Sequence, residues 1–362
     1  MNGTTSGKHF AALDGLRGIA VLTVVLSHLS LLHLNPFLID FSGIGKCGVY
    51  LFFVLSAFLL TYQFFEKGLG EGFTAGALAN YLWRRGLRVL PMFYLVVLVS
   101  GLTTAFLSRY LMGHGLPYTI PPRAVLPHLL LQQAVGVLWS VPVEFKFYFL
   151  LPLVAALFLA TGRRRVLVDV MLGAIAVALT LHWFPASEMR LGSVELRYYL
   201  PVFLIGSLCA SVAFKVPFDR HPRIASATAW LVAGVLVLTV PSIYSLVIRP
   251  VPIGYFQKSM MLYGVLWAVF LYMALYAQGW LRRLLTSRVL VFLGRISFSV
   301  YLLHFPILLI CRKFAPGNRW VGALAFAFIL LLSSQSYRWI ERPLSRIRLR
   351  DVRRLVRAAP VS

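Results

Sequence analysis

Long apolar segments constrain this chain more than any other feature. A helix needs roughly 20 mostly apolar residues to cross the ~30 Å hydrocarbon core of a bilayer. Ten segments of that kind are centred near residues 23, 55, 97, 149, 175, 205, 234, 269, 301 and 330. With 59% hydrophobic and 13% charged residues, the chain is too apolar for an ordinary soluble protein. The sequence therefore predicts an all-α, polytopic integral membrane helical bundle of about ten transmembrane helices.

The basic residues predict how the bundle is oriented. The formal net charge is +24, but lysines and arginines lie in short clusters between apolar segments rather than along one basic face, which argues against nucleic acid as a partner. With the N-terminus cytoplasmic, 21 basic residues fall inside, 10 outside, and four (Arg17, Lys146, Arg295 and Arg338) within helices. The positive-inside rule then predicts that both termini are cytoplasmic.

The chain reads as one membrane domain over residues 1–344, followed by a basic cytoplasmic tail over residues 345–362. The tail has the composition of a segment that lies on anionic lipids, and docking of a protein partner is the alternative. Three widely separated cysteines, Cys47, Cys209 and Cys311, match no metal-ligand spacing. We therefore interpret them as packing residues and expect no metal site.

The first apolar segment, FAALDGLRGIAVLTVVLSHL, contains Asp14, Arg17 and His28. Arg17 and His28 are close to three helical turns apart, so both project from one face, about 16 Å apart along the axis. Arginine suits phosphate and histidine suits proton transfer. The separation is comparable with an extended pantetheine arm, so a coenzyme A thioester fits along this helix. The alternative is that Arg17 anchors the helix at the cytoplasmic surface and His28 is a hydrogen-bonded bundle histidine.

Depth in the bilayer relates His28 to two other titratable residues. Glu144 lies about 24 Å from the cytoplasmic end of its helix, which is expected to end near Ala160. His304 lies about 22 Å along a helix that is expected to run outward from about Val289. The three groups therefore share nearly one depth, which spacing and topology alone predict. Titratable groups inside a membrane are functional candidates by default.

Polar stripes surround these groups on two predicted helices. The stripes are Ser140, Glu144 and Tyr148 on one helix, and Ser297, Tyr301 and His304 on the other. The spacings place each set on one helix face. Such faces either line a site or join helix to helix, and the second is the expectation for Ser140, Tyr148 and Ser297.

Three arginines, Arg84, Arg85 and Arg88, precede the third apolar segment on the predicted cytoplasmic side. The donors of arginine match phosphate oxygens, so this group either holds the phosphates of coenzyme A or contacts lipid headgroups.

The sequence resembles the membrane acyltransferase 3 family of bacterial inner-membrane O-acyltransferases. The resemblance runs nearly end to end, through Arg17 and His28 with ten residues between them, GVYLFFVLSAFLL at 48–60, RRGLRVLP at 84–91, LWSVPVEFKFYFLLP at 138–152, RISFSVYLLHFPIL at 295–308 and IERPL at 340–344. The chain departs from the family pattern at Ala57, Phe145, Lys146 and Phe298. These departures concern the polar environment of the site and the choice of acceptor.

The resemblance implies transfer of an acyl group, with acetyl expected, from acyl-CoA to a hydroxyl of a carbohydrate or glycoconjugate, such as a surface polysaccharide, lipopolysaccharide or peptidoglycan sugar. Some family members acylate macrolide-type natural products instead. We expect His28 to be the general base, with Glu144 orienting His28 or the acceptor. We expect Arg17, Arg84, Arg85 and Arg88 to bind the donor, and Ser140, Tyr301 and His304 to line the acceptor side.

Two other mechanisms remain open at this point. An acyl-enzyme on Ser56 or Ser140 is disfavoured, because neither serine lies in a G-x-S-x-G turn. A proton-coupled transporter or flippase would use buried His28, Glu144 and His304 as a proton relay. The inverted repeats and paired broken helices typical of such transporters are not evident in the sequence.

Overall fold

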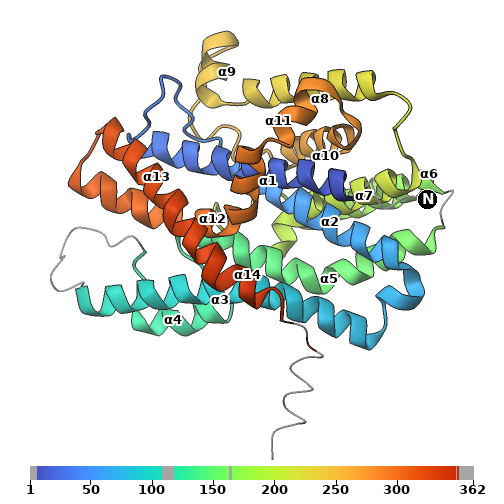
Figure 1. Ribbon diagram of the computed structural model, residues 1–362, viewed down its shortest axis with the longest axis horizontal. Coiled ribbons are helices and arrows are strands. Elements are labelled where there is room, and N and C mark those ends of the chain that lie inside the picture. The colour runs from blue at the N-terminus through green and yellow to red at the C-terminus, as the bar shows by residue number, and fades with distance from the viewer. Residues whose placement is uncertain (1–5, 108–117, 163–164, 348, 350–362) are drawn as a thin grey trace, which may run out of the picture.

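The computed structural model describes residues 6–107, 118–162, 165–347 and 349, and within these ranges the regular structure is entirely helical (Figure 1). The elements are α1 (Ser6–Leu31), α2 (Gly45–Gly72), α3 (Ala75–Leu107), α4 (Pro122–Leu129), the 3₁₀-helix η1 (Gly136–Trp139), α5 (Ser140–Ala160), α6 (Val166–Trp183), α7 (Leu196–Lys215), α8 (Pro222–Leu238), α9 (Pro241–Val247), α10 (Met260–Tyr276), α11 (Gly279–Leu285), α12 (Arg288–Phe314), α13 (Arg319–Ser336), the π-helical turn η2 (Tyr337–Glu341) and α14 (Arg342–Leu344).

Among the described residues, eight helices are long and apolar enough to cross a membrane, and the number rises to ten if each of two bent pairs is one span. The pair α8 and α9 is bent by 90°, and the pair α10 and α11 by 105°. Pro241 begins α9, and Gly279 begins α11 with a φ of +67° that favours glycine. All ten segment centres predicted from the sequence lie on these helices. The predicted polytopic helical membrane fold is confirmed, whereas most of the predicted tail, residues 348 and 350–362, lies outside the described residues.

The outward faces of the bundle are apolar. On α6, large side chains such as Leu167, Met171 and Trp183 are mostly exposed. Phe149 and Leu157 on α5 are exposed in the same way. A soluble protein rarely leaves so much contiguous apolar surface in water, so these faces are suited to lipid.

Helix α1 packs against α2 and α12 near the centre of the bundle (Figure 1). The packing is close because glycines stand where backbones meet. A Cβ atom at Gly294 of α12 would lie 1.8 Å from the carbonyl oxygen of Asp14, and one at Gly48 of α2 would lie 2.5 Å from that of Ala20. Small residues at such contacts let membrane helices approach. The glycines thereby bring the polar faces of α1, α2 and α12 together.

Candidate active site

A cavity of about 70 Å³ opens among α1, α2, α3, α5 and α12, and we call it the arginine cavity. That volume is several times the ~10–15 Å³ that one water needs. Its lining consists of Arg17, Val49, Phe52, Phe53, Ser56, Arg85, Arg88, Val89, Ser140, Val141, Glu144, Tyr148, Ser297, Phe298 and Tyr301. Residues that are far apart in the sequence and were singled out there as polar candidates therefore meet in one space.

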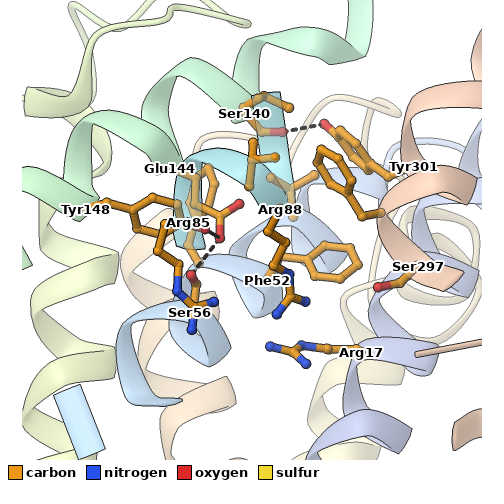
Figure 2. A pocket seen from close by; sticks show the side chains of 15 residues that line it. Arg17, Phe52, Ser56, Arg85, Arg88, Ser140, Glu144, Tyr148, Ser297 and Tyr301 are labelled. Carbon is orange, nitrogen blue, oxygen red and sulfur yellow. Dashed lines mark hydrogen bonds between the residues drawn. The ribbon is translucent and has the colours of Figure 1, made fainter. Parts of the chain in front are cut away.

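Positive charge gathers at one end of this cavity. Figure 2 shows the guanidinium groups of Arg17, Arg85 and Arg88 at that end, and Ser140 and Tyr301 at the other. Arg17 is partly balanced by Asp14, whose Oδ1 lies 3.3 Å from Nη1 of Arg17. An arginine cluster on converging helices is suited to bind phosphate groups, because guanidinium donors match their oxygens.

Arg84 differs from its two neighbours. Its side chain is exposed and it does not line the arginine cavity, unlike Arg85 and Arg88. The reason is helical geometry, since adjacent residues point about 100° apart around the axis. The structure therefore brings Arg17, Arg85 and Arg88 together and leaves Arg84 outside.

Glu144 lies in the middle of the arginine cavity and is held by two hydroxyl groups. The hydroxyl of Ser56 donates a hydrogen bond of 2.6 Å to its Oε1, and the hydroxyl of Tyr148 donates one of 2.7 Å to the same atom (Figure 2). Ser56 comes from α2, and Tyr148 lies one turn along α5 from Glu144. Tyr148, expected from the sequence to join helices, thus fixes a carboxylate inside the cavity.

Tyr301 closes the end of the arginine cavity away from the guanidinium groups. Its hydroxyl accepts a 2.8 Å hydrogen bond from Ser140 and donates to the carbonyl of Val137. The ring is nearly buried and is therefore fixed between α5, η1 and α12. Beyond it lies a second cavity, which also has Tyr301 and Val49 in its lining.

This second cavity has a volume of about 250 Å³, and we call it the His28 cavity. Its lining consists of Val24, Ser27, His28, Leu31, Gly43, Gly45, Lys46, Val49, Gly136, Val137, Trp139, Leu191, Gly192, Gln257, Tyr301 and Phe305. It lies where α1 ends and α2 begins, because Leu31 and Gly45 belong to those helix ends.

The imidazole of His28 is fixed by a backbone carbonyl and a second histidine. Its Nδ1 lies 2.9 Å from the carbonyl oxygen of Val24 and 3.2 Å from Nε2 of His304. The Nδ1 of His304 lies 2.7 Å from the carbonyl oxygen of Tyr301. Phe305 packs edge-on against His28, with ring centroids 4.9 Å apart. His304 is fully buried, whereas His28 remains partly exposed to its cavity.

The structure brings some of the predicted site residues together and separates others. His28 and His304, predicted to share a depth, are in contact. Glu144 does not reach His28, because it lies in the arginine cavity with Ser56 and Tyr148. Arg17 and His28 open into different cavities, which meet at Val49 and Tyr301.

The sequence pattern missed two residues of the His28 cavity, Lys46 and Trp139. Lys46 Nζ lies 4.4 Å from the centroid of the Trp139 ring. In the sequence, Lys46 looks like one more basic residue at the edge of an apolar segment. The one available signal was its position two residues before GVYLFF, at the predicted outer end of the helix.

Comparison with known proteins identifies the family. The sequence model of the acyltransferase domain family matches residues 10–338. Similar proteins include the peptidoglycan O-acetyltransferase OatA of Listeria monocytogenes (23% identity over 94% of this chain and 56% of that protein) and the putative peptidoglycan O-acetyltransferase YrhL of Bacillus subtilis (25% over 94% and 56%). A putative O-acetyltransferase of Staphylococcus aureus is 24% identical over 93% of this chain and 57% of its own length.

The chain thus spans little more than half the length of these curated relatives. No solved structure is significantly similar to it. The family match covers nearly the whole chain, including Arg17, His28 and the helices that form both cavities. The chain therefore belongs to the acyltransferase 3 family that its sequence motifs predicted.

Proposed function

We propose that this protein is a membrane O-acyltransferase that moves an acetyl group from acetyl-CoA to a hydroxyl of a carbohydrate. The family and the names of the relatives support O-acetyl transfer. The observation that carries the proposal is the pair of cavities that meet at Tyr301 and Val49, one lined by three arginines and the other by His28.

The arginine cavity is the proposed donor site. Arg17, Arg85 and Arg88 would bind the phosphates of coenzyme A, and the pantetheine arm would run past Ser140 toward Tyr301. The carboxylate of Glu144 lines the same cavity and would offset part of the arginine charge. Arg84, exposed outside the cavity, is assigned to lipid headgroups rather than to the donor.

The tautomer of His28 follows from its hydrogen bonds. A carbonyl oxygen only accepts, so Nδ1 of His304, beside the Tyr301 carbonyl, carries a proton and its Nε2 accepts. Nδ1 of His28, beside the Val24 carbonyl and Nε2 of His304, likewise carries a proton. In the neutral ring, Nε2 of His28 then has a free lone pair. It makes no hydrogen bond to any described residue, so it is available as a general base.

The proposed reaction is direct transfer. Nε2 of His28 takes the proton of the acceptor hydroxyl while that oxygen attacks the thioester carbonyl. The carbon–sulfur bond then breaks, the ester remains on the acceptor, and the thiolate recovers the proton from His28 as coenzyme A leaves. Proton transfer by a positioned base typically contributes 10² to 10⁴ in rate. His304 and the Val24 carbonyl, rather than Glu144, position the base.

The predicted orientation completes the proposal. With both termini cytoplasmic in a bacterial inner membrane, α1 begins at the cytoplasmic side and its end, near His28, lies toward the outer side. The arginine cavity then faces the compartment in which coenzyme A is made. The proposed acceptor is a glycan hydroxyl, as the names of the peptidoglycan O-acetyltransferase relatives favour. A macrolide-type natural product is the alternative acceptor.

A proton-coupled transporter would use the same histidines differently. A relay needs groups that pass a proton onward. A proton could pass from Nδ1 of His28 to Nε2 of His304, but the Nδ1–H of His304 points only to backbone carbonyls, which cannot carry it further. Glu144, the third member of such a relay, lies in the other cavity. These contacts favour a fixed base over a relay.

The deciding experiment uses the full-length protein in lipid nanodiscs with radiolabelled acetyl-CoA. We expect acetyl-CoA to raise the thermal unfolding temperature and label to appear in added cell-envelope glycans. A transporter would show neither effect. Mass spectrometry of glycans from cells with and without the gene would then identify the acceptor, through an acetyl increment that disappears with the gene. Absence of both stabilisation and labelling would refute the proposed activity.

A further inference from the structure

Lys46 is the second residue of α2, and its side chain lines the His28 cavity. Its ammonium nitrogen is buried and has no hydrogen-bond partner among the described residues. Other lysines near the bundle core do have partners: Lys146 donates to the carbonyl of Val194, and Lys215 to Asp169. Lys46 is therefore a buried cation whose partner the described protein residues do not supply.

The surroundings of Lys46 satisfy only one side of the ammonium group. The ring of Trp139 lies 4.4 Å away and the ring of Tyr199 lies 6.0 Å away, which are attractive cation–π contacts. An ammonium group nevertheless has three N–H donors, and an aromatic ring does not supply the negative charge of a counter-ion. The residues that line the His28 cavity include neither aspartate nor glutamate. A buried charge without a counter-charge is costly, so a negative group from a ligand would complete this environment.

Lys46 and His28 belong to one binding space. A Cβ atom at Gly45, the residue before Lys46, would lie 3.8 Å from Cε1 of His28, so the first turn of α2 approaches the imidazole directly. The positive end of the α2 dipole lies at the same place and adds to the attraction for an anion. A ligand that brings a hydroxyl to His28 can therefore bring a negative group to Lys46.

We propose that the His28 cavity contains a subsite for an anionic group, a carboxylate or a phosphate ester, on the acceptor glycan, with Lys46 as its binding cation. This inference rests on the proposed function and narrows the acceptor to an acidic sugar. The cavity volume of about 250 Å³ leaves room for more than water beside His28. Trp139 provides an apolar wall next to the cation.

The test measures sugar binding by equilibrium dialysis with the full-length protein in nanodiscs of neutral lipid. Three labelled probes separate the chemistries: methyl glucuronoside carries a carboxylate, glucose 6-phosphate carries a phosphate, and methyl glucoside carries neither. We expect one of the two acidic probes to bind at least tenfold more tightly than methyl glucoside. The acidic probe that binds more tightly shows whether the subsite accepts a carboxylate or a phosphate ester.

Variants of α2 then test whether Lys46 causes the preference for the acidic probe. Lys46→Gln should remove it, Lys46→Arg should keep it, and Lys67→Gln, the same change at an exposed position near the other end of α2, should leave it intact. Equal binding of all three probes, or a preference that survives in Lys46→Gln, would overturn the subsite. Acetyl transfer is not needed for this readout, so failure of the proposed activity and failure of the subsite are distinguishable.

Discussion

His304 on α12 places its Nε2 atom 3.2 Å from Nδ1 of His28 on α1. The two helices are held close by glycines such as Gly294, whose missing side chain leaves room for the Asp14 carbonyl. One buried histidine therefore fixes the ring of another that opens into a cavity. This arrangement separates the residue that would react from the residue that orients it.

Replacement of His28 should abolish transfer without unfolding the bundle. We expect His28→Ala to lower the rate of acetyl transfer by roughly 10² to 10⁴, the usual contribution of a positioned base. Label transferred from acetyl-CoA to glycan measures the effect at equal protein level. His182→Ala on α6, where the histidine is exposed, is the matched control. Wild-type activity in His28→Ala would exclude His28 as the base.

Replacement of His304 should lower the rate of acetyl transfer less than replacement of His28 does, because His304 orients the base and does not itself react. His304→Leu removes the acceptor for the Nδ1–H of His28 but leaves the Val24 carbonyl in place. Loss of one neutral hydrogen bond corresponds to roughly a threefold to tenfold decrease. We expect this decrease in kcat with little change in KM for acetyl-CoA, and partial recovery in His304→Gln, whose amide oxygen accepts a hydrogen bond. An effect on KM alone would contradict the positioning role.

The arginine cluster should govern donor affinity, with a control beside it in the sequence. Arg85→Gln and Arg88→Gln each remove a guanidinium from the arginine cavity, and a charge-assisted hydrogen bond is worth about 1.5–3 kcal/mol. We expect KM for acetyl-CoA to rise roughly tenfold to a hundredfold in each. Arg84→Gln, at an exposed position, should leave KM unchanged. Equal effects at all three positions would indicate a general effect of charge.

The glycine contact between α1 and α12 should be essential for stability. An alanine Cβ at position 294 would lie 1.8 Å from the Asp14 carbonyl oxygen, so the helices must move apart. Overpacking of this kind costs about 1–3 kcal/mol, and Gly294→Ala should unfold at a lower temperature in detergent. At Gly234 in α8 an added Cβ meets no atom within 4 Å. Gly234→Ala should be neutral or slightly stabilising, because alanine favours helices. Equal unfolding temperatures for Gly294→Ala and the wild-type protein would show that the bundle accommodates the added methyl group.

The length of the apolar segments was sufficient to predict the long helices, but not the short helices α4, α9 and α11 or the bends beside α9 and α11. All ten segment centres lie on helices because about 20 apolar residues in a row admit few other structures in a bilayer. Rise per residue also predicted that His28 and His304 share a depth, and the structure places the two imidazoles in contact, which depth alone did not predict.

The direction in which each side chain points, and therefore the neighbour that it contacts, was harder to predict. Glu144 was expected near the depth of His28, but depth alone does not say which neighbour a side chain faces, and it faces Ser56 and Tyr148. The sequence did not identify Lys46 as a site residue for a related reason. Its significance depends on the absence of an acidic residue from the lining of its cavity, and that lining comes from distant segments.

Tyr301, held by hydrogen bonds with Ser140 and with the Val137 carbonyl, lines both cavities. Because Tyr301 and Val49 line both cavities, a substrate arm in the arginine cavity and an acceptor in the His28 cavity would meet beside this ring. Under the proposed function, the acetyl group would pass beside a ring that two hydrogen bonds hold in place.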